Sequence, residues 1–236
     1  MQVVRITAKG SFNSFRIPSG IRYHRTYHIP TKPTLIGLLG AAIGLEDVEL
    51  SNIFNSVTTS AVLDSYSGMA TDLWLIAKLK TQGEPESSPI MREMLFEPCY
   101  SIYYSVSDSS DTSLEDIVNA FTDPIFALSL GRSDEMIEVK EITKVNLQSV
   151  SDGYFKNTIL PFNYKDFFDS YENLPLQRGQ TFSLPQVISI PTKFDIKDHI
   201  RKPLQYLDAT IVYDRGIKLR NKEGGLSDGQ RKFFLY

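Results

Sequence analysis

An apolar helix pattern near the start of the chain constrains the fold most strongly. The segment from Pro33 to Gly44 is almost wholly apolar, with proline in its first turn, where a missing amide donor costs nothing, and glycine at its end. Gly37, Gly40 and Ala41 leave one face of this helix thin. A strand or a partner backbone can approach that face closely, so the sequence predicts close packing there.

Strand patterns make up much of the remaining chain. They lie at residues 2–9, 59–66, 73–80, 94–106, 126–130, 181–190 and 205–213. The segment at 81–89 is polar and rich in turn-forming residues, and long strand patterns flank it on both sides. The sequence therefore predicts a projecting hairpin, with its outer part at about residues 78–97.

The pattern also predicts two further helices. One is short, near residues 50–56, and the other runs through Phe121 after the capping-box spacing of Thr112 and Glu115. A helix-bearing sheet followed by strand-rich material indicates an α+β fold. We place a first part at residues 1–147 and a strand-rich C-terminal part at residues 148–236.

Charge is distributed unevenly along the chain, whose formal net charge is −3. The first 45 residues carry six Lys and Arg and no Asp or Glu, whereas residues 46–214 carry 13 basic and 26 acidic groups. Residues 215–236 carry six basic and two acidic groups. A free-standing, sequence-indifferent nucleic-acid binder is usually basic overall. The two basic ends form one positive face only if the fold brings them together, and the acidic middle limits nonspecific binding of polyanions.

Most of the N-terminal positive charge lies in residues 14–33, where cations alternate with aromatic and imidazole rings. Guanidinium groups contact phosphates and aromatic faces stack on unpaired bases, so this composition suits a surface for single-stranded RNA. A solvated loop between two core elements is the competing interpretation. The candidate RNA-binding residues of this stretch are Arg16, Arg22, Tyr23, His24, Arg25, Tyr27, His28 and Lys32.

Length and composition limit the class of protein. With 236 residues and 42% hydrophobic content, the chain can bury a core as one large domain or as one domain with an appendage. It has no run of about 18 apolar residues and no signal-peptide pattern at its N-terminus, which favours a soluble, cytoplasmic protein without a membrane contact. The single cysteine, Cys99, cannot form an internal disulfide, and its strand-like context favours a small buried hydrophobe.

Two segments resemble a known family. Phe15-Arg16-Ile17-Pro18 followed by residues 26–45, and then residues 128–135, are similar in order and spacing to the two signature motifs of CRISPR-associated protein family five. The members of that family are the Cas-five subunits of type I interference complexes. The middle and the C-terminal third of the chain match the family by pattern only.

This resemblance implies a ferredoxin-like, RNA-recognition-motif-like domain with a protruding β-hairpin, called a thumb, and a variable second part. It implies a noncatalytic subunit of a type I CRISPR interference (Cascade) complex. Such a subunit binds the 5′ handle of crRNA, which is the repeat-derived tag of the guide RNA, and caps the backbone filament. Its partners would be the Cas-seven filament subunit, the large Cas-eight-type subunit and, indirectly through the complex, target DNA.

The thumb adds candidate RNA contacts outside the basic stretch. Lys78, Lys80 and Arg92 would supply charge, and Met91 and Leu95 an apolar wedge that enters between bases. Arg132, in the second motif, is interpreted either as a phosphate contact or as a contact within the fold, and the residues that follow it, 133–135, as a turn.

One branch of the family cleaves precursor crRNA without a metal, using a tyrosine, a lysine and a histidine, and this activity is the alternative function. Tyr27, His28 and Lys32 could form such a cluster, although nothing in their spacing demands it. The separation of His24 and His28 would suit a metal on a helix, but their neighbours indicate extended chain, and no acid or cysteine precedes Glu46. We therefore expect no catalytic residue, metal or cofactor. A protein interaction module without RNA is the third hypothesis.

Overall fold

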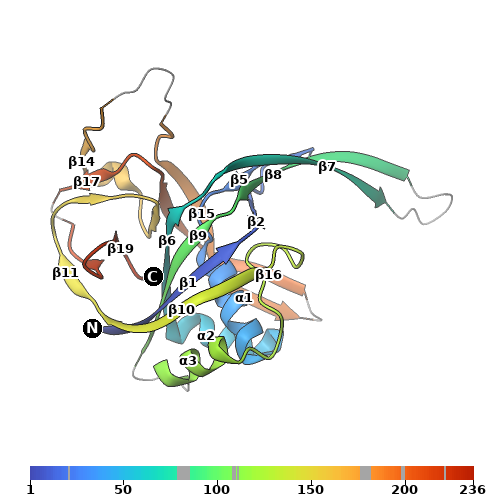
Figure 1. Ribbon diagram of the computed structural model, residues 1–236, viewed down its shortest axis with the longest axis horizontal. Helices are drawn as coiled ribbons and strands as arrows, with labels where there is room; N and C mark the ends of the chain where they lie inside the picture. Colours follow the sequence, from blue (N-terminus) through green and yellow to red (C-terminus); the bar gives the residue numbers. More distant parts are fainter. Residues whose placement is uncertain are drawn as a thin grey trace.

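A seven-stranded antiparallel sheet, ordered β10-β1-β9-β6-β13-β16-β15, forms the centre of the computed structural model (Figure 1). The structure describes residues 1–20, 22–78, 86–107, 110, 112–175, 182–197, 200–220 and 222–236. The strands of this sheet are β1 (Gln2–Gly10), β6 (Val57–Ser65), β9 (Cys99–Val106), β10 (Ile137–Asn146), β13 (Thr158–Leu160), β15 (Gln186–Lys197) and β16 (Ile200–Val212). Strands from both sides of residue 147 thus share one sheet, and the division at that residue stays a prediction.

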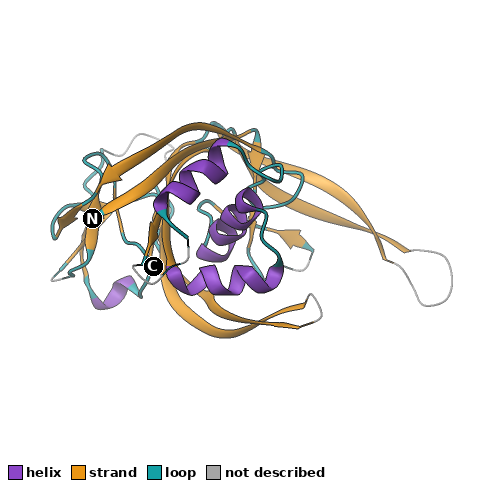
Figure 2. Cartoon of the chain, turned by 90° about the horizontal axis from the view of Figure 1, so that it is seen from below, coloured by secondary structure: helices purple, strands orange, loops and turns teal. Residues whose placement is uncertain are grey.

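Three helices lie against one face of this sheet, which makes the mixed α+β class of the fold plain (Figure 2). They are α1 (Lys32–Ile43), α2 (Asp47–Ser56) and α3 (Leu114–Thr122). The first helix lies where the sequence predicts it. It ends at Gly44, whose φ of 85° is a left-handed conformation that glycine adopts without strain. The capping box of α3 is formed by Ser113 and Asp116, one residue later than predicted. No helix among the described residues is long and apolar enough to cross a membrane.

The face of α1 that carries Gly37 and Gly40 packs against another helix, α2, rather than against the strand or partner backbone that the sequence predicts. A Cβ atom at Gly40 would lie 2.2 Å from Cδ2 of Leu50 in α2, so the Leu50 side chain occupies the space that glycine leaves. At Gly37, one turn earlier, no atom lies within 4 Å of the Cβ position. The close packing that the sequence predicts is therefore made at Gly40, and Gly37 faces open space.

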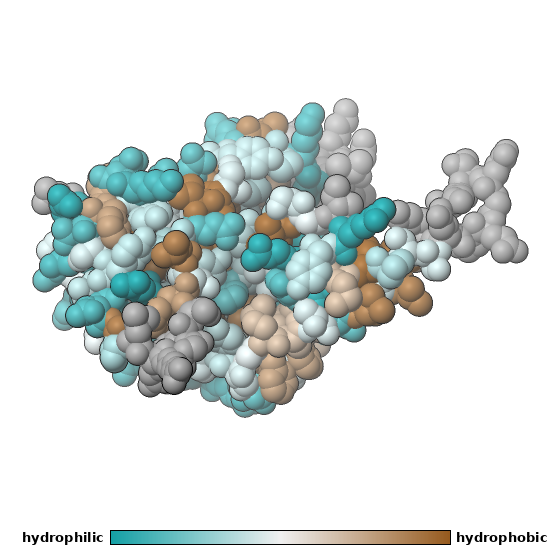
Figure 3. Space-filling model, turned by 90° about the horizontal axis from the view of Figure 1, so that it is seen from above, coloured by the Kyte–Doolittle hydropathy of each residue, from teal (hydrophilic) through white to brown (hydrophobic). Residues whose placement is uncertain are grey.

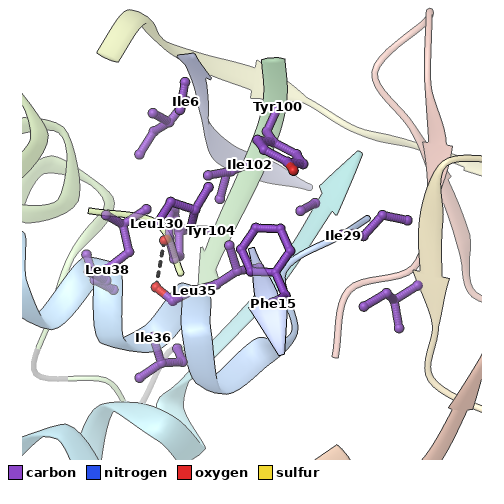
Figure 4. Close-up of a cluster of buried hydrophobic side chains, with 14 of the residues drawn as sticks. Ile6, Phe15, Ile29, Leu35, Ile36, Leu38, Tyr100, Ile102, Tyr104 and Leu130 are labelled. Carbon is purple, nitrogen blue, oxygen red and sulfur yellow. Dashed lines mark hydrogen bonds between the residues drawn. The ribbon is translucent and has the colours of Figure 1, made fainter. Parts of the chain in front are cut away.

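The main core lies between the helices and the sheet. Leu35 and Ile36 of α1 pack with Ile6 of β1 and with Ile102 and Tyr104 of β9, all of them buried (Figure 4). The Tyr104 hydroxyl donates to the backbone carbonyl of Leu35 at 2.8 Å, so its burial leaves no unpaired hydroxyl. Each large apolar side chain buried here contributes about 1.5–3 kcal/mol to folding.

The structure corrects the predicted strand at residues 94–106. This segment is divided at Glu97, whose φ is 49°, and at Pro98, which has no amide hydrogen for a sheet ladder. Residues before the division belong to β8 (Glu86–Phe96), and residues after it form β9 of the central sheet.

The strand predicted at residues 126–130 is wrong. Only an isolated bridge joins Ser129 to Met136. The amides of Ile125 and Phe126 instead donate to the carbonyls of Ala42 and Ala41, where α1 ends, at 3.0 and 3.2 Å. These bonds satisfy carbonyls that a helix end leaves unpaired, and they hold the segment against α1 rather than in the sheet.

A long hairpin projects from the body of the protein (Figure 1). It consists of β7 (Gly68–Lys78) and β8, which pair from Gly68 opposite Phe96 to Lys78 opposite Glu86. The hairpin therefore begins earlier in the chain than the outer part predicted at 78–97. Lys80 lies outside the described residues, and so does the side chain of Lys78.

The basic stretch folds as short extended pieces against the base of this hairpin. These pieces are β2 (Phe12–Asn13), β3 (Phe15–Arg16), β4 (Tyr23–His24) and β5 (Thr26–Tyr27). β3 pairs with β5, whereas β2 and β4 both pair with β8. The prediction that His24 lies in extended chain, not on a helix, is confirmed.

The C-terminal part adds two small sheets to the central one. One contains β11 (Gln148–Val150), β18 (Gly225–Ser227) and β19 (Lys232–Phe233), and the other contains β12 (Tyr154–Phe155), β14 (Phe168–Tyr171) and β17 (Ile217–Leu219). A short 3₁₀ helix, η1 (Tyr164–Asp166), precedes β14. The ring of Tyr103 in β9 stacks on Phe233 with 4.0 Å between centroids, which fixes β19 to the face of the sheet opposite the helices.

A buried carboxylate strengthens this attachment. The side chain of Asp228 is 1% exposed and accepts hydrogen bonds from the Tyr103 hydroxyl at 2.7 Å and from the amides of Gln230 and Arg231 at 3.0 and 2.8 Å. The Arg5 guanidinium lies 3.6 Å away. Burial raises the pKa of Asp228, but these hydrogen bonds and the Arg231 charge outweigh it and lower the pKa to about 2.

We predict that Asp228→Asn lowers the free energy of unfolding by about 2 kcal/mol at pH 7, because a pKa lowered from 3.8 to about 2 corresponds to that stabilisation of the charged form. The stabilisation is present above pH 4 and is lost as the pH falls toward 2. Chemical denaturation of both proteins between pH 7 and pH 2.5 measures the difference. A gap that stays constant over this range would contradict the account, and Asp123→Asn, at an exposed position, is the control.

Candidate nucleic-acid interface

The buried carboxylate of Glu135 joins three distant segments at one point. Its side chain accepts hydrogen bonds from the amide of Ser14 at 2.7 Å, from the Ser14 hydroxyl at 2.5 Å and from the amide of Arg132 at 3.0 Å. Nη1 of Arg92, from the hairpin strand β8, donates at 3.4 Å. Glu135 is only 3% exposed, so these donors replace the water that a carboxylate needs.

Two further residues shape the backbone around this carboxylate. Gly131 has a φ of 112°, and a Cβ there would lie 2.3 Å from Oε2 of Glu135 and 2.4 Å from the carbonyl oxygen of Ser14. Only glycine fits both the conformation and the space. The side-chain amide of buried Asn13 donates to the carbonyl of Leu130 at 2.6 Å. The second motif is thereby fixed to the start of the basic stretch.

Two arginines meet at an indole ring above this junction. The guanidinium carbon of Arg92 lies 3.7 Å from the ring centroid of Trp74, and that of Arg132 lies 4.6 Å from it. Arg92 is also near Asp72 at 3.8 Å and Asp134 at 3.7 Å. Cation–π contacts of this kind contribute about 0.5–2 kcal/mol each. The indole is therefore a common contact for two cations that come from different segments of the chain.

Side chains from the basic stretch complete a small open depression at this place. Its volume is about 10 Å³, and it is lined by Ser14, Arg16, His24, Arg25, Arg92, Glu93 and Arg132. We call these residues the arginine depression. Arg16 and Arg25 are exposed at its rim, whereas His24 and Arg92 are each 6% exposed. The fold thus unites cations that the sequence separates by more than a hundred positions.

Two guanidinium nitrogen atoms of the arginine depression lack a hydrogen-bond partner within the described chain. Within the part of the chain that the structure describes, Nε of Arg92 and Nη1 of Arg132 are buried and have no hydrogen-bond acceptor. Buried donors are almost always paired in folded proteins. The acids nearby interact with other nitrogen atoms, because Asp72, Asp134 and Glu135 lie near the Nη atoms of Arg92, and Glu93 lies 4.0 Å from Nε of Arg25. An anion with several oxygen atoms, such as a phosphate, would satisfy these donors.

Tyr23 and Arg22 lie beside the depression. Tyr23 is 41% exposed, and its hydroxyl donates to Glu93 at 2.7 Å, which raises the pKa of the phenol. That bond fixes the ring while leaving much of its face open. The Arg22 side chain is exposed, and the backbone carbonyl of Arg22 accepts a hydrogen bond from the amide of Met91 at 3.2 Å.

Tyr27, His28 and Lys32, which the sequence suggests as a catalytic cluster, each pack in their own surroundings. The His28 ring packs edge-on against Tyr213 with 5.0 Å between centroids, and burial lowers the pKa of His28. The Lys32 ammonium lies 5.1 Å from the ring centroid of Phe54, and burial lowers its pKa to about 8. Burial also raises the pKa of Tyr27. Among the described residues, no group of three or more His, Cys, Asp and Glu side chains is placed to hold a metal ion.

The apolar wedge predicted on the hairpin is partly wrong. Leu95 is fully buried at the hairpin base, so it cannot enter between bases. Among the described residues of the hairpin, the most exposed large apolar side chains are instead Leu73 and Leu75, which are 60% and 73% exposed and pair with Met91 and Pro89. Figure 3 shows apolar side chains gathered on this projection.

Sequence reasoning missed the residues that organise the site. The sequence pattern assigns Glu135 to a turn and Trp74 to a strand, because it does not show their distant partners. Ser14 and Arg92 lie 121 and 43 positions from Glu135, and Arg132, which lies over Trp74, comes from the second motif. The available signal was the pair of acids, Asp134 and Glu135, that follows Gly131 and Arg132, in a chain whose single tryptophan lies on the hairpin.

The fold and the site define a strand-rich α+β protein with a projecting hairpin and a cation cluster at its base. The sequence matches the family described as CRISPR-associated protein (Cas_Cas5) over residues 3–180. The chain belongs to this CRISPR-associated family. No curated protein matches it.

Solved structures with the same fold come from CRISPR systems. A chain of a structure named "CRISPR RNA-guided surveillance complex" superposes with a TM-score of 0.56 at 12% identity, covering 93% of this chain and 91% of that one. A CRISPR protein from Archaeoglobus fulgidus superposes with a TM-score of 0.53 at 9% identity, covering 98% and 97%. At these identities the likeness concerns the fold.

We predict that Glu135→Ala lowers the free energy of unfolding by about 3–5 kcal/mol, because it removes one partner of a buried ion pair and leaves Arg92 and the Ser14 amide without their acceptor. Denaturant titration measures the loss. The control is Asp134→Ala. The Asp134 side chain also lies near Arg92 but is 53% exposed, so this substitution should lower the free energy of unfolding by less than about 1 kcal/mol. Equal losses in the two variants would contradict the organising role of Glu135.

Proposed function

We propose that this protein is a noncatalytic subunit of a type I CRISPR interference complex and that the arginine depression binds the 5′ handle of crRNA. The observation that carries the proposal is the pair of buried guanidinium donors, on Arg92 and Arg132, that lack an acceptor within the described chain. A backbone phosphate that reaches these two nitrogen atoms would accept from both, while Arg16 and Arg25 at the rim would contact its neighbours.

The surroundings favour single-stranded RNA over a free phosphate. The half-open ring of Tyr23 lies next to Glu93, a residue of the depression, and could stack on a base that follows the bound phosphate. The exposed Leu73 and Leu75 on the hairpin could separate one base from the next. Cations, rings and an apolar projection in one place are the parts that a kinked single strand requires.

We further infer a ferredoxin-like core. Along the chain, β1, the helices α1 and α2, β6, β9, α3 and β10 follow one another in a βαββαβ pattern. In the sheet, these four strands lie in the order β10-β1-β9-β6, which places the fourth strand beside the first and the third beside the second. The hairpin, inserted between β6 and β9, would be the thumb of this core.

Membership in the family supports the proposed partners, which are the Cas-seven filament subunit, the large Cas-eight-type subunit and, through the complex, target DNA. Capping of the filament is part of the same proposal. The matched structure named for an RNA-guided surveillance complex is consistent with such an assembly.

RNA binding is tested with a synthetic repeat-derived tag, by fluorescence anisotropy between 50 and 200 mM salt. We predict that Arg16→Ala/Arg25→Ala weakens binding about tenfold or more at low salt and lowers the slope of log affinity against log salt by about 1.4, as expected for two lost contacts to single-stranded phosphates. The control, Lys140→Ala/Arg220→Ala, removes the same charge from two sites paired with Glu138 and Asp169. Equal effects of the two double variants would place the RNA elsewhere.

The enzymatic alternative needs its own assay. Full-length repeat RNA is incubated with the native protein, His24→Ala and His28→Ala, with and without EDTA. We predict that none of the three cuts the RNA, because the half-buried His28 ring packs on Tyr213 and the Lys32 ammonium lies over the ring of Phe54. Metal-independent cutting at the handle boundary that either substitution abolishes would establish the endoribonuclease instead.

A further inference from the structure

A second cleft lies between α1, α2 and the β15–β16 hairpin, and it shares no lining residue with the arginine depression. Figure 2 shows this hairpin alongside the helices. The cleft has a volume of about 190 Å³. Its apolar lining consists of Pro33, Ile36, Leu50, Phe54 and Phe194. Neither RNA binding nor the contacts of Glu135 uses any of these residues.

Gly37 keeps this cleft open. Glycine in a helix interior is unfavourable relative to alanine, so it usually answers a need for close packing. At Gly40 that need is visible, because Leu50 occupies the space a side chain would take. At Gly37 no atom lies within 4 Å of the Cβ position, and the residue lines the cleft. The missing side chain therefore leaves a cavity rather than a contact.

The size and walls of the cleft suit one aromatic ring. An apolar cavity of about 150 Å³ admits benzene, so the space here is sufficient for a phenylalanine or tyrosine side chain. Phe54 and Phe194 already meet edge to face with 5.6 Å between centroids. A third ring can join them in the offset or edge-on geometry that aromatic groups prefer.

The charges around the cleft differ between its two sides. Lys193 and Arg201 both come from the β15–β16 hairpin. The opposite wall is α2, which is preceded by Glu46 and carries Glu49 in its first turn, both exposed. A nucleic-acid strand would meet these acids, whereas a short peptide with a single carboxylate beside its ring meets only the cations.

We propose that this cleft binds a short acidic segment of a partner protein through one aromatic side chain. The ring lies over Gly37, and a neighbouring carboxylate of the segment pairs with Lys193 or Arg201. Asn52, Asn55 and Thr192, which also line the cleft, bind the peptide backbone. Such an anchor is a typical centre of a protein interface.

The test uses synthetic peptides and ligand-observed NMR, which detects weak binding. The probe is a capped pentapeptide with a central phenylalanine flanked by aspartates, compared with peptides that carry alanine at the centre or lysines at the flanks. We expect the first peptide to bind the native protein at least tenfold more tightly than the other two. Binding of none of the peptides, or equal binding of all three, would overturn the proposal.

Two variants locate the site. Gly37→Leu places a side chain in the cleft, where a Cβ atom meets nothing within 4 Å, and should weaken binding of the acidic aromatic peptide at least tenfold. Gly37→Ala should have a small effect. Lys193→Glu should reduce the preference for aspartate over lysine flanks. Unchanged thermal stability and unchanged binding of the repeat-derived tag show that Gly37→Leu is folded. Undiminished peptide binding by Gly37→Leu, or displacement of the peptide by an oligouridine, would refute the proposed occupant.

Discussion

The buried carboxylate of Glu135 is the interaction on which the candidate interface depends. It accepts from Ser14 in the basic stretch, from Arg92 in the hairpin and from the backbone of the second motif. Without it, three segments that are far apart in the chain would have no common polar partner in a buried place. With it, Arg92 and Arg132 are held over Trp74, and their remaining donors are left for a ligand.

This arrangement accounts for the unusual charge distribution. The acidic middle of the chain supplies Glu93, Asp134 and Glu135, which neutralise part of the arginine cluster in the folded protein. What remains is a local site with a few oriented donors, not a broad basic surface. For the RNA binding proposed above, such a local site would add selectivity, because acidic groups elsewhere in the chain repel polyanions.

Local signals in the sequence predicted what depends on neighbouring residues. The helix at Lys32–Ile43 follows from its proline start and glycine end, and the extended form of the basic stretch follows from its proline and aromatic content. Predictions failed where distant contacts decide the structure. The division at Pro98 separates a hairpin strand from a core strand, although residues 94–106 read as one continuous strand.

The same limit applies to the site. Arg16, His24 and Arg25 could be selected from composition, and they do converge, but the sequence placed Arg92 and Arg132 in separate regions. No short-range pattern in the sequence shows that Glu135 and Trp74 lie beside the arginines of the depression.

The most direct measurement is photo-crosslinking of a repeat-derived RNA tag that carries 4-thiouridine, followed by mass spectrometry of the crosslinked peptides. The account predicts crosslinks in residues 13–27, in the hairpin segment around Trp74, and in residues 128–135. Crosslinks confined to the helices α1 and α2 or to the C-terminal sheets would contradict it.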